Sequence, residues 1–155
     1  MSAVPLDRID RHILALLQAS GRMSNADLAA EVNLSASACH RRVRQLEASG
    51  VIDRYVAVVD QAAIGRPTSV FAEISLNSQS EEALEAFEQA VRDCPDILEC
   101  YLMSGDADYL LRVAVADAGD YERIHRRHLS AFPGVSRIRS SFALRTVCQN
   151  TVLEV

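Results

Sequence analysis

Apolar residues recur at helical spacing near the start of the chain, which predicts three short helices within residues 6–50. Asp7 can cap the first helix, Ser24 opens the second in a Ser-x-x-acid capping box, and Ser35 can cap the third, which Gly50 ends. A turn of about three residues separates the last two helices, an arrangement typical of a helix-turn-helix. The apolar positions expected to face inward are Ile9, Ile13, Leu16, Leu17, Leu28 and Val32.

After Gly50 the pattern changes to one that favours β-structure. Residues 51–60 are rich in valine and are predicted to form either a short wing or the first strand of a linker. Gly65 and Pro67 mark the best candidate for a domain boundary. The predicted organisation is a winged helix-turn-helix domain over residues 1–60, a linker over 61–67 and a second domain over 68–155.

Beyond the linker, strand and helix patterns alternate. The predicted elements are strands at 68–76, 97–103, 109–115 and 135–147, with helices at 80–92 and 121–132. The order β-α-β-β-α-β is that of the ferredoxin-like arrangement, in which both helices cover one face of a single sheet. The sequence therefore predicts the α+β fold class.

The charge of the chain is divided unevenly between these two parts. The 155 residues carry a net charge of −5, from 16 arginines, no lysine and 21 acidic residues. Residues 1–60 hold seven arginines and seven acidic residues, so residues 61–155 carry all of the excess negative charge. The acidic total does not exclude nucleic-acid binding by the first part, because arginine binds phosphates and guanine edges.

The composition also disfavours several classes of protein. No apolar run approaches the roughly 18 residues that span a bilayer, and residues 1–8 lack the pattern of a secretory signal, so no membrane association is expected. No P-loop, glycine-rich nucleotide motif or nucleophile–base motif is found, so we expect neither an enzyme nor a bound cofactor. The cysteines are widely spaced and are expected to be reduced thiols of a cytoplasmic protein: Cys39, Cys94, Cys100 and Cys148.

The third predicted helix has one apolar edge and one polar face. Cys39, Val43 and Leu46 fall within about 60° of one another on a helical projection, and the opposite side carries Ser, His and Arg side chains suited to a DNA major groove. Arg42 flanks the apolar stripe, where it can reach a phosphate or pair with an acidic residue inside the domain. The alternative is a solvated basic face on a small helical bundle. The candidate DNA-binding residues are Ser35, Ser37, His40, Arg41, Arg42 and Arg44.

A second group of polar residues joins two predicted strands. The segment Gly105–Tyr109 contains two carboxylates and a glycine, which can bind the ammonium and carboxylate groups of a small ligand. An ordinary hairpin turn is the alternative, because Gly and Asp are common turn residues.

His125 and His128, three residues apart on a helix, can chelate a metal, but no carboxylate or cysteine is adjacent in sequence. An exposed helix face explains these histidines better, and no metal site is expected.

Several stretches together resemble the Lrp/AsnC, or feast/famine, family of transcriptional regulators. The resemblance covers nearly the whole chain, and its stretches are specific in this order and spacing. They are 6–11, 21–25, 34–35 with Cys39, 42–47, 99–111 and 132–135.

The resemblance implies a DNA-binding first domain and a second domain that senses an amino acid and assembles copies of the chain. Members of this family form homodimers that often assemble into octamers, and a small amino acid binds between dimers. Carried over by position, the effector-binding candidates are Leu102, Ser104, Gly105, Asp106, Asp108, Ser140, Ser141 and Phe142. A close relative has a Thr-Tyr pair at the positions of Ser140 and Ser141, so the resemblance does not identify leucine as the effector. Arg41 replaces an acidic residue of that relative, so operator preference does not carry over.

The expected function is therefore sequence-specific binding of double-stranded DNA by a regulator of amino-acid-related metabolism that responds to a small amino acid. The competing hypothesis is a ferredoxin-like module that binds a small ligand or catalyses a reaction, with a helical segment that serves only protein contacts.

Overall fold

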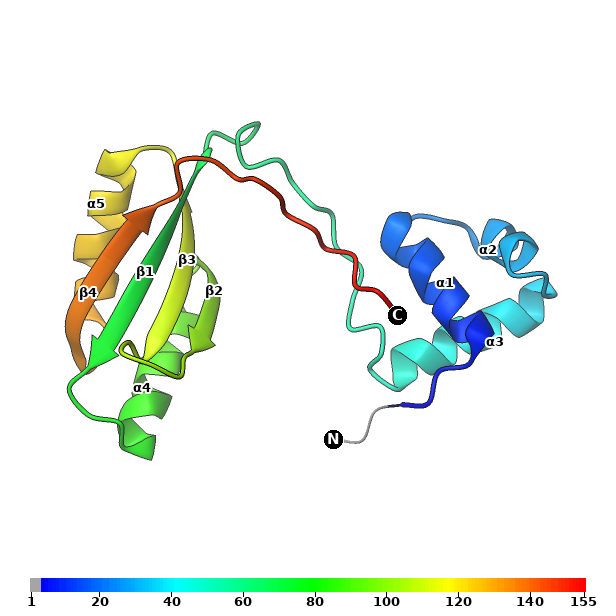
Figure 1. Cartoon of the computed structure of the whole chain (residues 1–155), viewed down its shortest axis with the longest axis horizontal. Helices are drawn as coiled ribbons and strands as arrows, with labels where there is room; N and C mark the ends of the chain where they lie inside the picture. The colour runs from blue at the N-terminus through cyan, green and yellow to red at the C-terminus, as the bar shows by residue number, and fades with distance from the viewer. Residues whose placement is uncertain (1–3) are drawn as a thin grey trace. The chain divides into compact units, whose positions relative to one another are not determined.

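A computed structural model describes residues 4–155, so residues 1–3 of the predicted first domain lie outside the described residues. The chain forms two compact units (Figure 1). The first contains the chain up to Val58 together with Cys148–Val155, and the second contains Val59–Val147. The end of the chain thus groups with the first unit, although the sequence pattern assigns it to the second domain.

The first unit is built on three helices, α1 (Arg8–Ala19), α2 (Asn25–Glu31) and α3 (Ala36–Ala48). Their N-caps are the predicted residues Asp7, Ser24 and Ser35, each of which accepts a hydrogen bond from a backbone N–H of the first turn. No helix within residues 4–155 has the length and apolar character needed to cross a membrane.

A tight turn connects α2 to α3. Asn33 takes a positive φ of 55°, a conformation that asparagine tolerates better than most residues, and the Leu34 N–H donates to the Ala29 carbonyl at 2.9 Å. The apolar sides of the three helices meet in one core, where Ile13 and Cys39 are fully buried. This arrangement confirms the predicted helix-turn-helix.

The segment expected to form a wing or linker strand has no strand pairing in the described chain. Residues 51–60 include no assigned strand, and Tyr55, Val56 and Val58 are exposed. The expectation of a strand at this position is therefore wrong for the single chain. β-propensity describes how a side chain fits a paired, half-buried surface, and this segment has no partner strand.

The C-terminal residues are bound to the first unit by one side chain. The Gln18 amide donates to the Leu153 carbonyl at 3.0 Å and accepts from the Leu153 N–H at 2.7 Å. This pair of hydrogen bonds satisfies both backbone groups of one tail residue.

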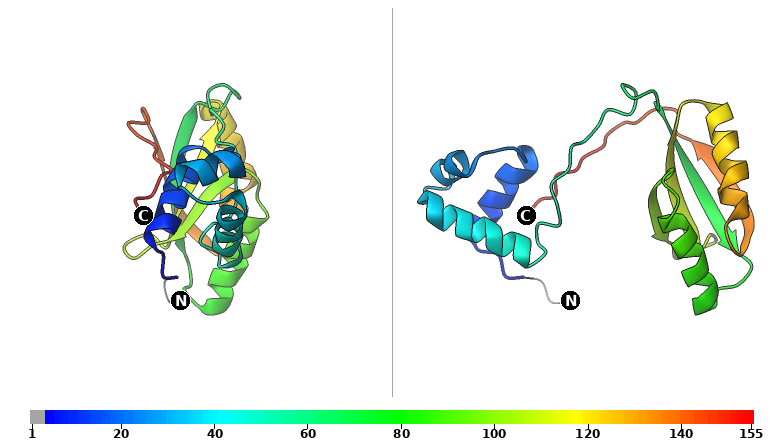
Figure 2. Two further views of the ribbon diagram at one scale, coloured as in Figure 1. Left: turned by 90° about the vertical axis from the view of Figure 1, so that its right-hand side faces the viewer. Right: turned by 180° about the vertical axis from the view of Figure 1, so that it is seen from behind.

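The second unit is a four-stranded antiparallel sheet in the order β2-β3-β1-β4 with two helices. Figure 2 shows that both helices cover the same face of the sheet. The order of elements confirms the ferredoxin-like fold. The elements are β1 (Thr68–Leu76), α4 (Glu81–Arg92), β2 (Ile97–Leu102), β3 (Tyr109–Val115), α5 (Ala118–Arg127), the 3₁₀ turn η1 (Leu129–Ala131) and β4 (Val135–Phe142).

The core of the second unit lies between the sheet and its helices. Alternate residues of β1 are buried against α4 and α5, and Phe87 of α4 packs on Tyr109 and Phe132 with ring centroids 4.5 and 5.7 Å away. The opposite face of the sheet carries Phe71 and charged residues, and neither helix of the second unit covers it.

Two predicted boundaries in this unit differ from the structure. Helix α5 begins at Ala118 instead of Tyr121, because the Asp117 side chain accepts from the Asp120 N–H and caps the helix earlier. Strand β4 ends at Phe142 instead of Val147. The Ala143 N–H still donates to the Ser69 carbonyl at 2.9 Å, but β1 begins at Thr68, directly after Pro67, so the register leaves no strand partner for residues 145–147.

We expect Phe87→Ala to lower the free energy of unfolding of the second unit by about 3–5 kcal/mol, because it removes a fully buried ring. Urea denaturation followed by far-UV circular dichroism measures this change. Leu144→Ala, which alters an exposed residue, serves as the control and should shift stability by less than about 0.5 kcal/mol. Equal effects of the two substitutions would contradict the assigned core.

Candidate functional site

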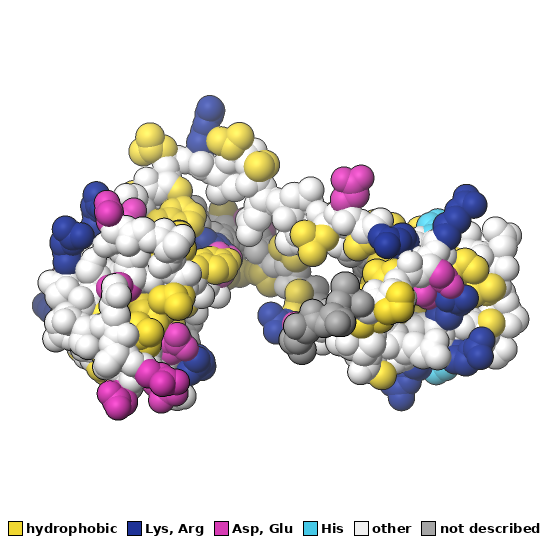
Figure 3. Space-filling view, turned by 60° about the horizontal axis from the view of Figure 1, so that its bottom comes forward, with side chains coloured by type: hydrophobic (Ala, Val, Ile, Leu, Met, Phe, Trp, Pro, Cys, Tyr) yellow, Lys and Arg dark blue, Asp and Glu magenta, His cyan; other side chains and the backbone are white. Residues whose placement is uncertain are grey.

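The outer face of α3 carries most of the side chains predicted to bind DNA. Cys39 and Leu46 are buried and hold the helix against α1 and α2. Ser37, His40 and Arg41 are exposed on the other side. In Figure 3, arginine side chains stand out from the surface of the helical unit.

The two outward arginines of α3 are free to bind an anion. Arg44 has 71% of its side chain exposed and lies 3.6 Å from Glu47, a distance too long for a hydrogen bond. Arg41 forms no ion pair with any residue of the described chain, 4–155. Because exposed ion pairs are weak, Arg44 can exchange Glu47 for a phosphate or a base edge at little cost.

Arg42 is used inside the first unit. Its guanidinium lies 2.8 Å from the Asp7 carboxylate and 2.7 Å from that of Asp10, and only 25% of its side chain is exposed. The Asp10 N–H and then Arg42 hold the pKa of Asp7 below its ordinary value, and both carboxylates raise the pKa of Arg42. Of the two alternatives for this residue, the structure therefore shows the internal ion pair, which joins α3 to the start of α1.

Ser35 also has a structural task. Its Oγ accepts from the Ala38 N–H at 3.2 Å and lies 3.2 Å from the Ser37 Oγ. Its hydroxyl thus caps α3, so the exposed candidate groups of this face that have no role in capping or in the ion pair of Arg42 are Ser37, His40, Arg41 and Arg44.

The candidate effector residues of the β2–β3 connection fall into two kinds. Ser104, Gly105 and Asp106 are exposed, and Gly105 adopts a φ of 145°. Asp108, by contrast, accepts from the Leu76 N–H at 2.7 Å and from the Gln79 amide at 2.6 Å. Its carboxylate therefore fixes the connection to the end of β1 as well as offering a charge.

The candidates on β4 point to two different faces of the sheet. Ser140 is paired with the buried residue Ala72 and Phe142 with buried Val70, so both face the helices. The Ser140 hydroxyl shares a hydrogen bond with Tyr121 of α5, and Phe142 packs edge-on against the same ring. Ser141 faces the opposite, uncovered side.

A single chain does not bring the two groups of effector candidates together. Leu102 ends β2 at one edge of the sheet, whereas Ser140, Ser141 and Phe142 lie on β4 at the other edge, with β3 and β1 between them. A site that used both groups would have to combine residues from two copies of the chain.

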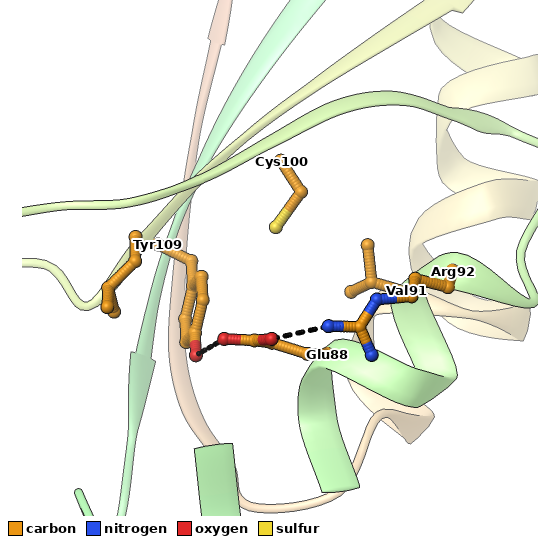
Figure 4. A pocket seen from close by; sticks show the side chains of 6 residues that line it. Glu88, Val91, Arg92, Cys100 and Tyr109 are labelled. Carbon is orange, nitrogen blue, oxygen red and sulfur yellow. Dashed lines mark hydrogen bonds and ion pairs between the residues drawn. The ribbon is translucent and has the colours of Figure 1, made fainter. Parts of the chain in front are cut away.

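Leu102 also lines a cavity that the sequence did not predict. This cavity of about 240 Å³ lies between α4 and the edge of the sheet, and Figure 4 shows its polar residues. Glu88 accepts from the Tyr109 hydroxyl at 3.0 Å and from Arg92 at 2.6 Å. The spacing of Glu88 and Arg92, one helical turn apart, was the only sequence signal for this pair.

The cavity is not equipped with a reactive nucleophile at neutral pH. Burial, and next the nearby Glu88 charge, raise the pKa of the Cys100 thiol to about 11. Burial and the hydrogen bond to Glu88 raise the pKa of Tyr109 to about 12. Both groups are therefore protonated, and the thiolate needed for nucleophilic attack is scarce.

Two protein-family models match the chain. A winged helix-turn-helix DNA-binding model matches residues 6–53, and the model of the Lrp/AsnC ligand binding domain matches residues 69–153. The matches agree with the fold class predicted from the sequence and found in the structure.

Similar proteins match over nearly the full length of the chain. The Bkd operon transcriptional regulator of Pseudomonas aeruginosa is 43% identical over 92% of this chain and 93% of its own length. The leucine-responsive regulatory protein of Escherichia coli is 40% identical over 97% of this chain and 92% of its own length. A transcriptional regulator of Neisseria meningitidis, solved in complex with L-Met, has a TM-score of 0.90 at 33% identity and covers 96% of each chain.

We expect Arg42→Met to lower the free energy of unfolding of the first unit by about 1–2 kcal/mol, because it leaves Asp7 and Asp10 without their cation. The Asp10 N–H and then Arg42 lower the folded pKa of Asp7, so the stabilisation that Arg42 adds through Asp7 is complete above the ordinary pKa of aspartate and disappears as the pH falls through the folded value. The difference in the free energy of unfolding between variant and parent should therefore become smaller below about pH 4. Thermal unfolding at several pH values measures it.

Arg44→Met is the matched control, because it removes the same charge from an exposed position on the same helix. It should change stability by less than about 0.5 kcal/mol. If the difference in the free energy of unfolding between Arg42→Met and the parent did not depend on pH, this result would argue against the ion pair.

Proposed function

The chain belongs to the Lrp/AsnC family of transcriptional regulators, and we propose that it binds double-stranded DNA through the outer face of α3 under the control of a small amino acid. The observation that carries this proposal is the exposed pair of arginines, Arg41 and Arg44, on the side of α3 that faces away from its buried apolar edge. A regulator that acts on DNA works in the cytoplasm of a bacterial cell.

The geometry of α3 is suited to a major groove. Arg41 and Arg44 are three residues apart on one exposed face, and arginine binds guanine through two parallel hydrogen bonds. In a homodimer, a two-fold axis would present two copies of α3 to successive major grooves, about 34–36 Å apart. The acidic second unit would add little to DNA affinity, which depends on cationic contacts with phosphates.

The second unit would supply assembly and ligand sensing. The uncovered face of its sheet carries Phe71 and Tyr101 in exposed positions, which favours contact with another copy. The effector candidates lie on opposite edges of the sheet, so a shared site would form only where dimers meet, as in an octamer. An amino acid bound there would shift assembly or DNA affinity only if one state binds it better.

The relative bound to L-Met supports an amino acid as the ligand class. The exposed Asp106 carboxylate is suited to an ammonium group, and backbone N–H groups around Gly105 are suited to a carboxylate. Regulation of amino-acid-related metabolism is the function that agrees with such a ligand.

We expect replacement of both Arg41 and Arg44 by Ala to weaken binding to a promoter fragment at least about tenfold per arginine. The slope of log K against log salt should also become shallower by about 0.9 for each phosphate that the variant no longer neutralises. Electrophoretic mobility shift and fluorescence anisotropy at several salt concentrations measure both quantities.

The matched control replaces Arg126 and Arg127 of α5 by Ala, which removes the same charge from exposed positions of the second unit. This control should leave DNA binding unchanged, and size-exclusion chromatography should show the same assembly for all variants. Unaltered DNA binding by the α3 variant would instead favour a ligand-binding or catalytic module whose helices serve protein contacts.

For the ligand site, we expect Asp106→Asn to abolish the change in DNA affinity caused by the effector while leaving the melting temperature without ligand unchanged. Asp108→Asn should lower that melting temperature, because Asp108 holds Leu76 and Gln79. A thermal-shift screen of the twenty amino acids identifies the effector, since a ligand that binds only the folded state raises the melting temperature. A normal response from Asp106→Asn would place the site elsewhere, and Glu122→Gln is the exposed control.

A further inference from the structure

We propose that Cys94, Asp96 and His128 form a binding site for a transition-metal dication such as Zn²⁺. The sulfur, carboxylate and imidazole ligand atoms of these three residues lie within 4.8 Å of one another. Cys94 and Asp96 belong to the connection between α4 and β2, and His128 follows the last residue of α5. The fold thus brings a cysteine and a carboxylate close to His128, although neither residue is near it in the sequence.

The distances agree with a tetrahedral centre after a small adjustment. Zinc binds nitrogen and oxygen at about 2.0–2.2 Å, so two such ligands stand roughly 3.3–3.5 Å apart in a tetrahedron. The His128 Nε2 lies 3.7 Å from the Asp96 Oδ2. All of the ligand atoms lie within 4.8 Å of one another, so side-chain movements of at most about 1 Å would close the three residues on a metal.

The three groups lack hydrogen-bond partners that would compete with a metal. Asp96 is 14% exposed and His128 is 26% exposed, while Cys94 is buried. Among residues 4–155, the structure gives neither the Asp96 carboxylate nor the His128 ring a hydrogen bond, in contrast to the two that Asp108 accepts. No fully buried side-chain N or O atom within residues 4–155 lacks a partner, so solvent still reaches this carboxylate, and a metal could bind it without breaking an existing hydrogen bond.

Two guanidinium groups face the same carboxylate and must be accounted for. Arg66 and Arg123 approach Asp96 at 3.6 and 3.8 Å, and Arg123 donates its hydrogen bonds to Asp120 instead. Both arginine side chains are about two-fifths exposed, so each can turn toward solvent when a cation binds. The thiolate of Cys94 and the carboxylate of Asp96 together balance the two positive charges of the metal.

The ligand set selects the kind of metal. A thiolate and an imidazole favour zinc, cobalt or copper over magnesium and calcium, which bind oxygen ligands. Three protein ligands leave the fourth position to water or to a group from another molecule. A bound metal would join the α4–β2 connection to the end of α5 within the second unit, independently of α3 and of the effector candidates.

The test is titration of the reduced, metal-free full-length protein with Co²⁺, followed by optical absorption. We expect one equivalent to bind with visible bands of tetrahedral cobalt and a near-ultraviolet thiolate-to-cobalt band, and Zn²⁺ to displace it. Cys94→Ser should remove the thiolate band, and His128→Gln should weaken Co²⁺ binding by at least about tenfold. Zn²⁺ should raise the melting temperature of the parent and not that of Cys94→Ser.

Two control variants test whether Co²⁺ binds at the proposed site and not at another histidine or cysteine. His125→Gln removes the histidine of α5 that lies three residues before His128, and Cys148→Ser removes an exposed thiol outside the cluster. Both should bind Co²⁺ as the parent does. Absence of the thiolate band in the parent, or its loss only in Cys148→Ser, would overturn the proposal, as would binding that His128→Gln leaves unchanged. Circular dichroism of each variant shows that it is folded.

Discussion

Helix α3 packs against the core of a unit with only two other helices, so one of its sides stays in contact with water. Cys39 and Leu46 are buried against the other two helices, and Arg42 is drawn inward by two carboxylates. At 3.6 residues per turn, these contacts leave the side with Arg41 and Arg44 facing solvent. The position of the proposed DNA-binding surface therefore follows from the packing of the helix and needs no special arrangement of the arginines themselves.

In the second unit, side chains alternate between the two faces of a strand, and this alternation decides which residues of β4 face solvent. Pairing with Ala72 and Val70 turns Ser140 and Phe142 toward α5, and Ser141 is left on the uncovered face. The strand order then separates these residues from the β2–β3 connection by the width of two strands. If a ligand uses residues of both edges, as we propose, the topology of the sheet would couple its binding to assembly.

The sequence was sufficient for features that depend on neighbouring residues. The caps at Asp7, Ser24 and Ser35 were predicted from short-range patterns, and the alternation of apolar residues predicted the order of the elements. The end of β4 was not predicted, because it depends on where the partner strand β1 begins. Short-range patterns could not predict features that depend on contacts between residues distant in the sequence. Whether Arg42 would bind outward or inward depended on the position of α1, and the approach of Cys94 to His128 requires the complete fold.

The hydrogen bonds between Gln18 and Leu153 make the last residues of the chain part of the unit that contains its first helices. Affinity tags or deletions at the carboxyl terminus are therefore not neutral choices when this protein is produced. Such changes would first alter the stability of α1, which is more than a hundred positions away in the sequence. They would have a smaller effect on the stability of the sheet to which the tail is covalently attached.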